Sequence, residues 1–330
     1  MPPPAVIGAL GAGRMGRGIA HAFAYAGHEV VLLDMKPRDA AAAAALREAG
    51  MKEIGASLAA LAELGAFSAD EIPAMLARIR FAARDEAPAA LAGIDVLFEG
   101  VPEVLEAKRE AFAFACAHLP SHSIVASTTS TMLSTELAAF VTNPGRFLNC
   151  HWLNPAYLIP LVELSPHPGT EPAVLARMKA MLEKIGKKPV VCKAAPGYIV
   201  PRFQALIMNE AARMLEQGVA TPEDIDRAVR YGFGLRYATM GVVEFIDYGG
   251  LDILYYASRY MSGALGDARF APPEIVERYM AQGRVGLRSG QGFFDWGTTD
   301  VAAYRKDVLA RQLDLFGHLG LVPAPGAALG

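Results

Sequence analysis

Short apolar runs alternate with alanine-rich stretches from Ala5 to about Cys150. The apolar runs predict buried strands and read AVIGAL, EVVLLD, IDVLFEG and SIVAST. Between them, the spacing of apolar and polar residues predicts helices over Arg14 to Ala26, Arg38 to Ala83 and Lys108 to His118. Because apolar strands separated by helices are typical of a parallel sheet covered on both faces, the pattern predicts a doubly wound α/β domain.

The pattern changes near the segment CKAAPGY, where Pro196 and Gly197 interrupt it. Beyond this point apolar residues recur with helical spacing, and there is almost no strand pattern. The expected helices are Ile199 to Gln217, Pro222 to Tyr231, Val242 to Gly263, Pro273 to Gln282 and Val301 to Phe316. We therefore expect an α/β domain over residues 1–195, an all-α domain over residues 196–297, and a C-terminal helical extension and tail over residues 298–330.

Composition and charge exclude several classes of protein. The 330 residues carry a formal net charge of −3, so the chain has no large basic field for nucleic acid or anionic lipid. The longest uncharged stretch, Ala111 to Thr135, contains Pro120 and a run of hydroxyl side chains, so we do not expect it to span a membrane. The start of the chain, MPPPAVIGAL, has no basic region before its apolar run and lacks a secretory-signal pattern, which predicts a cytoplasmic location.

The cysteines do not indicate a metal site or a disulfide framework. Cys116, Cys150 and Cys192 are odd in number, far apart in sequence and outside any CxxC or Cys/His spacing. We expect buried free thiols and no bound metal. A metal site is the alternative that this spacing disfavours.

A glycine motif follows the first predicted strand and begins the first predicted helix. The motif is Gly11-Ala12-Gly13-Arg14-Met15-Gly16. In this context Gly11 permits a tight turn, Gly13 lets the backbone approach a pyrophosphate, and Gly16 lets the helix pack on the strand. The motif predicts a Rossmann-type dinucleotide site, whereas a glycine-rich turn without a ligand is the alternative. Gly8, inside the strand, leaves open whether the turn is shifted in register.

Asp34 ends the second predicted strand, 18 residues after Gly16. An acid near this place binds the ribose hydroxyls of NAD, and its charge repels the 2′-phosphate of NADP. The sequence therefore predicts NAD as the cofactor. Lys36 and Arg38 lie just beyond and could soften the preference, and a strand-end turn is the other reading of Asp34.

His151 lies between residues that predict two neighbouring strands, FLNCHWL and IPLVEL, joined by a proline-containing turn. If the two strands run antiparallel, Glu163 comes beside His151 although twelve residues separate them. A histidine can accept the proton of an alcohol while hydride leaves the carbon, and a carboxylate can orient the ring and stabilise the imidazolium. A single histidine is more often structural, and the sequence contains six others.

Over nearly its whole length the chain resembles the 3-hydroxyacyl-CoA dehydrogenase family. The similar segments begin with AVIGALGAGRMGRGIA and continue in the family's order. They include FEGVPEVLEAKREAF, STTS, HWLNP followed by LVE, PGYIVPR, NEAARMLEQGVATPEDIDRA and GRVGLRSGQGFFDW.

The resemblance implies roles for residues throughout the chain. These are His151 as catalytic base, Glu163 as its partner, Ser130 near the substrate oxygen and nicotinamide, Asn154 near the nicotinamide, and Glu103 and Lys108 near the cofactor ribose. Several of these residues have simpler readings as well. Ser130 can be turn chemistry, Glu103 a helix cap, and Lys108 a solvated side chain of the same helix.

Two positions depart from the family pattern. Where the family usually has an asparagine that helps to hold the substrate, PGYIVPR has Pro201, which has no N–H to donate. Arg288 stands where the family often has lysine, which keeps a positive charge near the cofactor but changes its geometry.

The segments YLIPLVELSPHPGTEPA and YGFGLRYATMGVVE resemble the branch of the family that acts on free hydroxy acids, such as gulonate and carnitine dehydrogenases and lambda-crystallin. Arg236, in GLRYA, offers a planar fork suited to a carboxylate, whereas a thioester carbonyl has no charge to pair. The expected substrate is a small 3-hydroxy acid, and a 3-hydroxyacyl-CoA is the alternative. An arginine at a helix junction is otherwise a surface or capping residue.

Two further hypotheses come from other classes. A dehydrogenase of the 6-phosphogluconate type has a similar glycine motif but uses a lysine base on a glycine-rich helix, and no such helix is evident here. A non-enzymatic, crystallin-like NAD-binding protein is the other. The apolar stripes over Ile199 to Leu215 and Val242 to Tyr260, together with the resemblance, predict a homodimer, although a core within the domain explains the stripes equally well.

Overall fold

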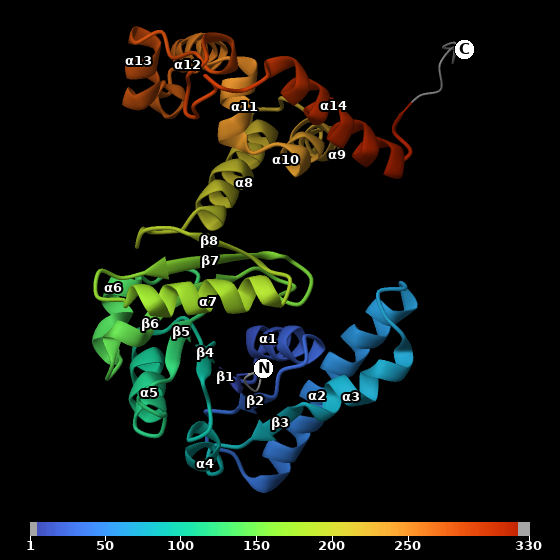
Figure 1. Ribbon diagram of the computed structural model, residues 1–330, viewed down its shortest axis with the longest axis vertical. Helices are drawn as coiled ribbons and strands as arrows, with labels where there is room; N and C mark the ends of the chain where they lie inside the picture. The colour runs from blue at the N-terminus through green and yellow to red at the C-terminus, as the bar shows by residue number, and fades with distance from the viewer. Residues whose placement is uncertain (1–4, 323–330) are drawn as a thin grey trace. The chain divides into compact units, whose positions relative to one another are not determined.

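An eight-stranded sheet forms the centre of the first half of the chain (Figure 1). The computed structural model describes residues 5–322, and the chain divides into two units, Met1–Met208 and Asn209–Gly330. The strand order is β3-β2-β1-β4-β5-β6-β7-β8, and every neighbouring pair is parallel except β6 and β7. The strands are β1 (Ile7–Leu10), β2 (Val30–Leu33), β3 (Ile79–Ala82), β4 (Val96–Glu99), β5 (Ile124–Ser127), β6 (Phe147–Trp152), β7 (Leu161–Pro166) and β8 (Lys188–Val191).

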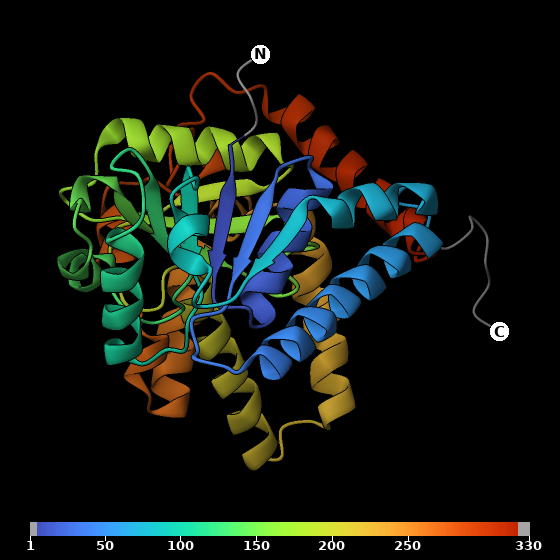
Figure 2. The ribbon, with the colours of Figure 1, turned by 90° about the horizontal axis from the view of Figure 1, so that it is seen from below.

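Helices cover both faces of this sheet, so the predicted doubly wound architecture is confirmed. Alternate residues of a strand serve opposite faces: Phe98 packs in the cluster with α1, α2 and α7, whereas Leu97 packs with α4 and α5. The blue and teal strands lie side by side in Figure 2. The helices of this unit are α1 (Arg14–Tyr25), α2 (Ala40–Glu63), α3 (Ile72–Ala77), α4 (Ala87–Leu91), α5 (Leu105–Cys116), α6 (Ser134–Leu137), α7 (Pro172–Lys184) and α8 (Val200–Glu216), the last of which runs into the second unit, with short 3-10 turns at Ala69–Glu71, Ala138–Phe140 and Pro144–Arg146.

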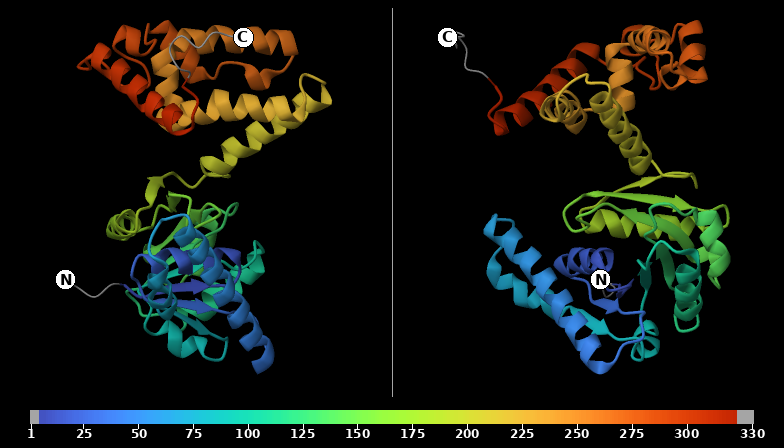
Figure 3. Two further views of the ribbon diagram at one scale, coloured as in Figure 1. Left: turned by 90° about the vertical axis from the view of Figure 1, so that its right-hand side faces the viewer. Right: turned by 180° about the vertical axis from the view of Figure 1, so that it is seen from behind.

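The prediction of one helical region from Arg38 to Ala83 was wrong at its end. Helix α2 ends at Glu63 before a turn in which Gly65 has φ +82°, and the chain returns through α3 into β3. Helices α2 and α3 lie side by side, in two shades of blue in Figure 3. Strand β3 pairs with β2 alone, and only its first and last residues are buried. An edge strand of this kind lacks the continuous apolar run that marks the central strands.

The second unit is helical in residues 209–322, apart from isolated bridges at Gln291. Its helices are α9 (Pro222–Ala228), a π-helical turn (Val229–Gly234), α10 (Leu235–Thr239), α11 (Val242–Gly249), α12 (Leu251–Leu265), α13 (Glu274–Ala281) and α14 (Val301–His318), with short 3-10 turns at Ala268–Phe270 and Leu287–Ser289. The helix predicted over Val242 to Gly263 is divided, because Gly250 has φ +109° and breaks the regular backbone.

The structure of residues 5–322 bears on the expectations about membrane spans and cysteines. No helix in this range has the length and hydropathy to cross a membrane. Cys150 is a buried free thiol as expected, but Cys116 and Cys192 are only partly buried, since they lie at the ends of an outer helix and an edge strand. Within the same range no cluster of three or more His, Cys, Asp or Glu residues could hold a metal ion.

Candidate active site

The glycine turn after β1 lines a cleft of about 680 Å³. Gly11 has φ +107°, and a Cβ there would lie 2.8 Å from the carbonyl oxygen of Gly100. A Cβ on Gly16 would lie 2.0 Å from the carbonyl oxygen of Gly11, so α1 can approach the strand only with glycine at this position. Gly8 has a different reason: its Cβ would meet Ile94 at 2.5 Å, so it serves packing and does not shift the turn.

The start of α1 leaves donors available to an anion. Gly13 is the N-cap and provides no side-chain hydrogen bond, and a Cβ there would meet nothing within 4 Å. The N–H groups of the first turn, including those of Arg14 and Met15, therefore have no side-chain cap. Free N–H groups at a helix N-terminus favour phosphate, and the turn without side chains leaves room for it. These features fit the pyrophosphate of a dinucleotide.

Asp34 lies at the end of β2 and lines the same cleft. Its side chain is buried, and Arg38 donates from Nε to Oδ2 at 2.5 Å. The backbone N–H of Lys36 donates to Oδ1 at 3.2 Å. A carboxylate in this place could accept ribose hydroxyls, but a guanidinium already holds one of its oxygens.

The strands β6 and β7 bring His151 and Glu163 together. They are antiparallel, and these two residues are direct cross-strand partners. His151 Nδ1 lies 2.7 Å from Glu163 Oε2, with His151 4% and Glu163 0% exposed. Nε2 of His151 has no hydrogen-bond partner among residues 5–322, and His151 lines a cavity of about 400 Å³ with Met15, Ser130 and Asn154. The apolar runs around the two residues allowed this pairing, and the resemblance to the family singled it out.

Glu163 is held in its charged form by several donors. Burial alone would raise the pKa of this carboxyl, but hydrogen bonds from His151 and from the backbone N–H groups of Val200 and Ile199 outweigh burial and lower it. Both backbone N–H groups donate to Oε1 at 2.9 Å, and α8 begins at Val200. Oε2 therefore remains for the imidazole. The start of α8 fixes the carboxylate that orients the ring.

Tyr198 packs against the imidazole, and our sequence analysis did not single it out. Its ring is parallel to that of His151, with 5.0 Å between centroids and 5° between planes. Its hydroxyl donates to the carbonyl oxygen of Thr129 and accepts from Asn149 Nδ2, each at 2.9 Å. Tyr198 has φ +44°, a strained backbone for a bulky residue that the surrounding contacts must hold. The segment PGYIVPR, which carried part of the family resemblance, was the only sequence signal for it. In the structure Gly197, just before Tyr198, also has a positive φ.

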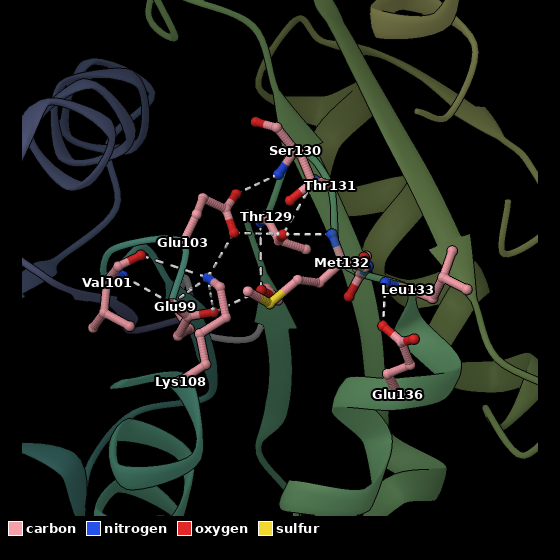
Figure 4. Close-up of polar contacts among 12 residues, drawn as sticks. Glu99, Val101, Glu103, Lys108, Thr129, Ser130, Thr131, Met132, Leu133 and Glu136 are labelled. Carbon is pink, nitrogen blue, oxygen red and sulfur yellow. Dashed lines mark hydrogen bonds and ion pairs between the residues drawn. The ribbon is translucent and has the colours of Figure 1, made fainter. Parts of the chain in front are cut away.

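Glu103, Lys108 and Ser130 belong to one polar network (Figure 4). Oε1 of Glu103 accepts the backbone N–H of Ser130 at 2.6 Å. Lys108 is not the solvated helix residue of the simpler reading, because it is 1% exposed and donates to both oxygens of Glu99 at 3.0 and 3.1 Å. The hydroxyl of Ser130 points away from this network in Figure 4, and Ser130 lines the cavity of His151.

The remaining predicted residues are placed as follows. Asn154 is exposed beside Pro155 and lines the cavity of His151, as Pro201 does. In the second unit, Arg236 lies in α10 with its guanidinium 4.4 Å from the centroid of the Phe245 ring. Arg288 pairs with Asp252 at 2.9 Å, and its side chain is 63% exposed.

Together these features define the class of the protein. A doubly wound sheet with a glycine turn at a helix N-terminus, a carboxylate at the end of β2 and a buried His–Glu pair is the equipment of a nicotinamide-dependent dehydrogenase. Residues 6–195 match the family model described as 3-hydroxyacyl-CoA dehydrogenase, NAD binding domain. Residues 197–296 match the model described as 3-hydroxyacyl-CoA dehydrogenase, C-terminal domain. The chain therefore belongs to the 3-hydroxyacyl-CoA dehydrogenase family and is an NAD-dependent oxidoreductase acting on a CH–OH group.

Known proteins of several names are similar to this chain. A 3-hydroxybutyryl-CoA dehydrogenase of Bradyrhizobium diazoefficiens is 34% identical over 290 residues, which cover 88% of this chain and 94% of that protein. Lambda-crystallin of Oryctolagus cuniculus is 34% identical over 255 residues, 77% of each chain. The crystal structure of a 3-hydroxyacyl-CoA dehydrogenase from Archaeoglobus fulgidus has a TM-score of 0.74 and 33% identity, and covers 96% of this chain and 100% of that one.

Proposed function

We propose that this enzyme oxidises the 3-hydroxyl of a small L-3-hydroxy acid to the 3-oxo acid, with His151 as base and Glu163 as its partner. The observation that carries the proposal is the 2.7 Å contact from His151 Nδ1 to Glu163, with Nε2 unpaired among residues 5–322 and a cavity beside the ring. A ring fixed through Nδ1 keeps its other nitrogen available for the alcohol proton.

Bound NAD supplies the acceptor for the hydride. In the proposed mechanism, Nε2 of His151 accepts the proton of the substrate hydroxyl, and Glu163 stabilises the imidazolium that forms. The hydroxyl of Ser130 donates to the substrate oxygen, and Asn154 orients the reacting groups from the same cavity. Met15 and the glycine turn hold the dinucleotide beside them. Glu103 and Arg288 are proposed to support the cofactor, and buried Lys108 to do so only through its contact with Glu103.

The choice of a free acid rests on Arg236 and Pro201. Arg236 is partly exposed, and its guanidinium lies over the Phe245 ring, so its N–H groups are available to a carboxylate. Pro201 lines the cavity of His151 at the position where the family usually has an asparagine, so this chain lacks that amide contact to the substrate. A contact between Arg236 and a carboxylate elsewhere on the substrate would replace it. A 3-hydroxyacyl-CoA is the second candidate, because the Bradyrhizobium relative is named for such a substrate. A non-enzymatic role, as the name lambda-crystallin suggests for another relative, is the third.

A kinetic comparison tests the proposed function directly. With NAD as acceptor, we expect larger kcat/KM values for 3-hydroxybutyrate, gulonate or carnitine than for 3-hydroxybutyryl-CoA. Larger values for the CoA ester would establish the second candidate. Tight NAD binding without turnover of any of the four compounds would establish the third.

Arg236→Met is expected to raise KM for a free acid by about tenfold or more and to leave KM for a CoA ester nearly unchanged. A charge-assisted hydrogen bond contributes roughly 1.5–3 kcal/mol, and methionine cannot form it. Arg230→Met is the matched control, since Arg230 is an exposed arginine in the adjacent π-helical turn. Initial-rate kinetics on both substrates would contradict the carboxylate contact if the two KM values rose equally.

Asp34→Ala is expected to reduce the preference for NAD over NADP in kcat/KM by about tenfold or more. The carboxylate is lost, and Arg38, which it now holds at 2.5 Å, becomes available to a 2′-phosphate. The double variant Asp34→Ala/Arg38→Ala should lose the gain for NADP, because both partners of the ion pair are gone. Kinetics with both cofactors decide the point, and an unchanged preference in Asp34→Ala would move the ribose contact elsewhere.

The chain is also proposed to act as a homodimer. Helix α8 exposes Phe203, Leu206, Ile207 and Met208, each at least 47% accessible. An apolar stripe of this kind is unusual on a monomer and suits contact with a second copy of the chain.

A further inference from the structure

Glu99, the last residue of β4, is a buried carboxylate with an unusually full set of donors. It is 0% exposed, and it accepts from Ser127 Oγ at 2.6 Å, from the backbone N–H of Val101 at 2.8 Å and from Lys108. Burial raises the pKa of this carboxyl, and Lys108 and the hydrogen bonds act in the opposite direction. Burying a carboxylate costs free energy unless hydrogen bonds and an opposite charge compensate the lost hydration, and here Ser127, Val101 and Lys108 provide them.

Lys108 joins this buried carboxylate to a second one nearer the surface. Its ammonium contacts both oxygens of Glu99 and lies 3.6 Å from Oε2 of Glu103, whose side chain is 40% exposed. At 1% exposure the ammonium is directed to these two acids and to the carbonyl oxygen of Val101 at 3.5 Å. It is therefore a bridge between two carboxylates.

Glu103 in turn holds the loop that follows β5. Besides the backbone N–H of Ser130, it accepts the hydroxyl of Thr129 at 2.8 Å. Thr129 Oγ1 then accepts the backbone N–H groups of Thr131 and Met132 at 3.3 and 3.1 Å. Figure 4 shows the continuous chain of contacts from Glu99 to this loop.

We propose that Glu99 is a positioning residue, which acts through Lys108 and Glu103 to fix the backbone of Ser130 and so aims the Ser130 hydroxyl into the cavity of His151. The role of Ser130 in catalysis rests on the proposed function above, whereas the fixing of its backbone does not. A buried ion pair is a poor source of stability, because apolar residues of similar volume are often neutral or stabilising in its place. The Glu99–Lys108 pair is better explained by its effect on geometry: through Glu103 it fixes the position of the Ser130 amide.

Glu99→Gln is the direct test, since it keeps the shape of the side chain and removes its charge. Lys108 is then drawn toward Glu103, and the acceptor that Glu103 offers to Ser130 weakens. We expect hydrogen exchange at the Ser130 amide, measured on the protein without cofactor, to become about tenfold faster. Unchanged exchange at this amide would overturn the proposal, whatever the activity of the variant.

The matched control is Ser123→Ala, which removes another buried hydrogen-bonding group near the opposite end of β5. Ser123 donates to the carbonyl oxygen of Ile94 at 2.6 Å and has no link to Glu103. It should lower stability without changing exchange at Ser130. If Glu99→Gln does not fold, Glu99→Gln/Lys108→Met removes both charges, leaves no buried charge unpaired and reports the same amide.

A double-mutant cycle separates positioning from a general loss of structure. If Glu99 acts through Ser130, the fall in kcat caused by Glu99→Gln, expected at about tenfold, should largely disappear in a Ser130→Ala background. Ser123→Ala should instead give the same fold-change in both backgrounds. Multiplicative effects of Glu99→Gln and Ser130→Ala would overturn the coupling. If Ser130→Ala alone leaves kcat unchanged, the catalytic role of Ser130 fails, and amide exchange still decides whether Glu99 positions the loop.

Discussion

Replacing His151 with alanine is expected to lower kcat by about two to four orders of magnitude while leaving the affinity for NAD nearly unchanged. Among residues 5–322, the imidazole is the only group with a free basic nitrogen that lines the cavity of about 400 Å³ beside Ser130 and Asn154. The glycine turn and Asp34, which are proposed to hold the dinucleotide, line a different cleft, of about 680 Å³, and His151 is not among the residues that line it. Steady-state kinetics and a fluorescence titration with NAD measure the two quantities separately.

A second buried histidine provides a matched control for this prediction. His21 is 2% exposed, lies 2.7 Å from Ser57 Oγ and stacks on Tyr157 with 4.3 Å between ring centroids. Burial, with a smaller effect of Lys187, lowers its pKa to about 4, so it is a neutral structural imidazole at neutral pH. His21→Ala should lower Tm and change kcat little. Equal losses of kcat in the two variants would mean that His151 is structural too.

The contact between His151 and Glu163 could be predicted in part, because strands that are neighbours in the sequence often pair. The residues FLNCHWL and IPLVEL are each apolar enough to be buried, and a short turn between two strands makes them antiparallel neighbours. Antiparallel pairing allows Glu163 to come beside His151, and the structure makes them direct partners. The resemblance to the family, and not the spacing, singled out His151 among the seven histidines. The glycine turn was predictable for a similar reason, since the steric demands of Gly11 and Gly16 follow from the passage of a strand into a helix.

Contacts between residues distant in sequence were beyond the same reasoning. Tyr198 reaches His151 across 47 positions, and only the folded chain brings the two rings together. Lys108 shares its helix turn with exposed residues, so its helical pattern suggests solvent, yet Glu99 on the neighbouring strand draws it inward. Arg38 and Asp34 are only four positions apart, but their contact depends on a side-chain rotamer that periodicity does not predict.

The second unit illustrates how glycine and side-chain anchors modify a helical pattern. Gly250 divides one predicted helix into α11 and α12. The buried carboxylate of Asp247 then accepts from the backbone N–H groups of Phe293 and Phe294 and from Trp296 Nε1, which fixes the GQGFFDW loop. A carboxylate with three such donors is an anchor for an irregular segment, and apolar spacing alone gives no sign of it.

Glu163→Gln is expected to lower kcat by about two orders of magnitude or more. The carboxylate accepts from Nδ1 of His151 at 2.7 Å, which keeps the proton on that nitrogen and leaves Nε2 as the base. An amide can turn its NH₂ group toward the ring and favour the other tautomer, and it has no charge to stabilise the imidazolium, a combination that is severe in other His–carboxylate pairs. Glu171→Gln, which removes a half-exposed carboxylate 3.6 Å from Arg146, is the control and should leave kcat unchanged.

The same variant carries a pH signature in stability. Because hydrogen bonds hold the pKa of Glu163 below its usual value in the folded protein, its ionised form stabilises the fold above the ordinary pKa of a glutamate. That contribution is lost as pH falls through the lowered, folded-state pKa. The difference in Tm between wild type and Glu163→Gln should therefore be largest near neutral pH and shrink in acid, where both side chains are neutral. A difference that stays constant from pH 7 to acid would mean that the loss comes from packing and not from the charge that His151, Ile199 and Val200 hold in place.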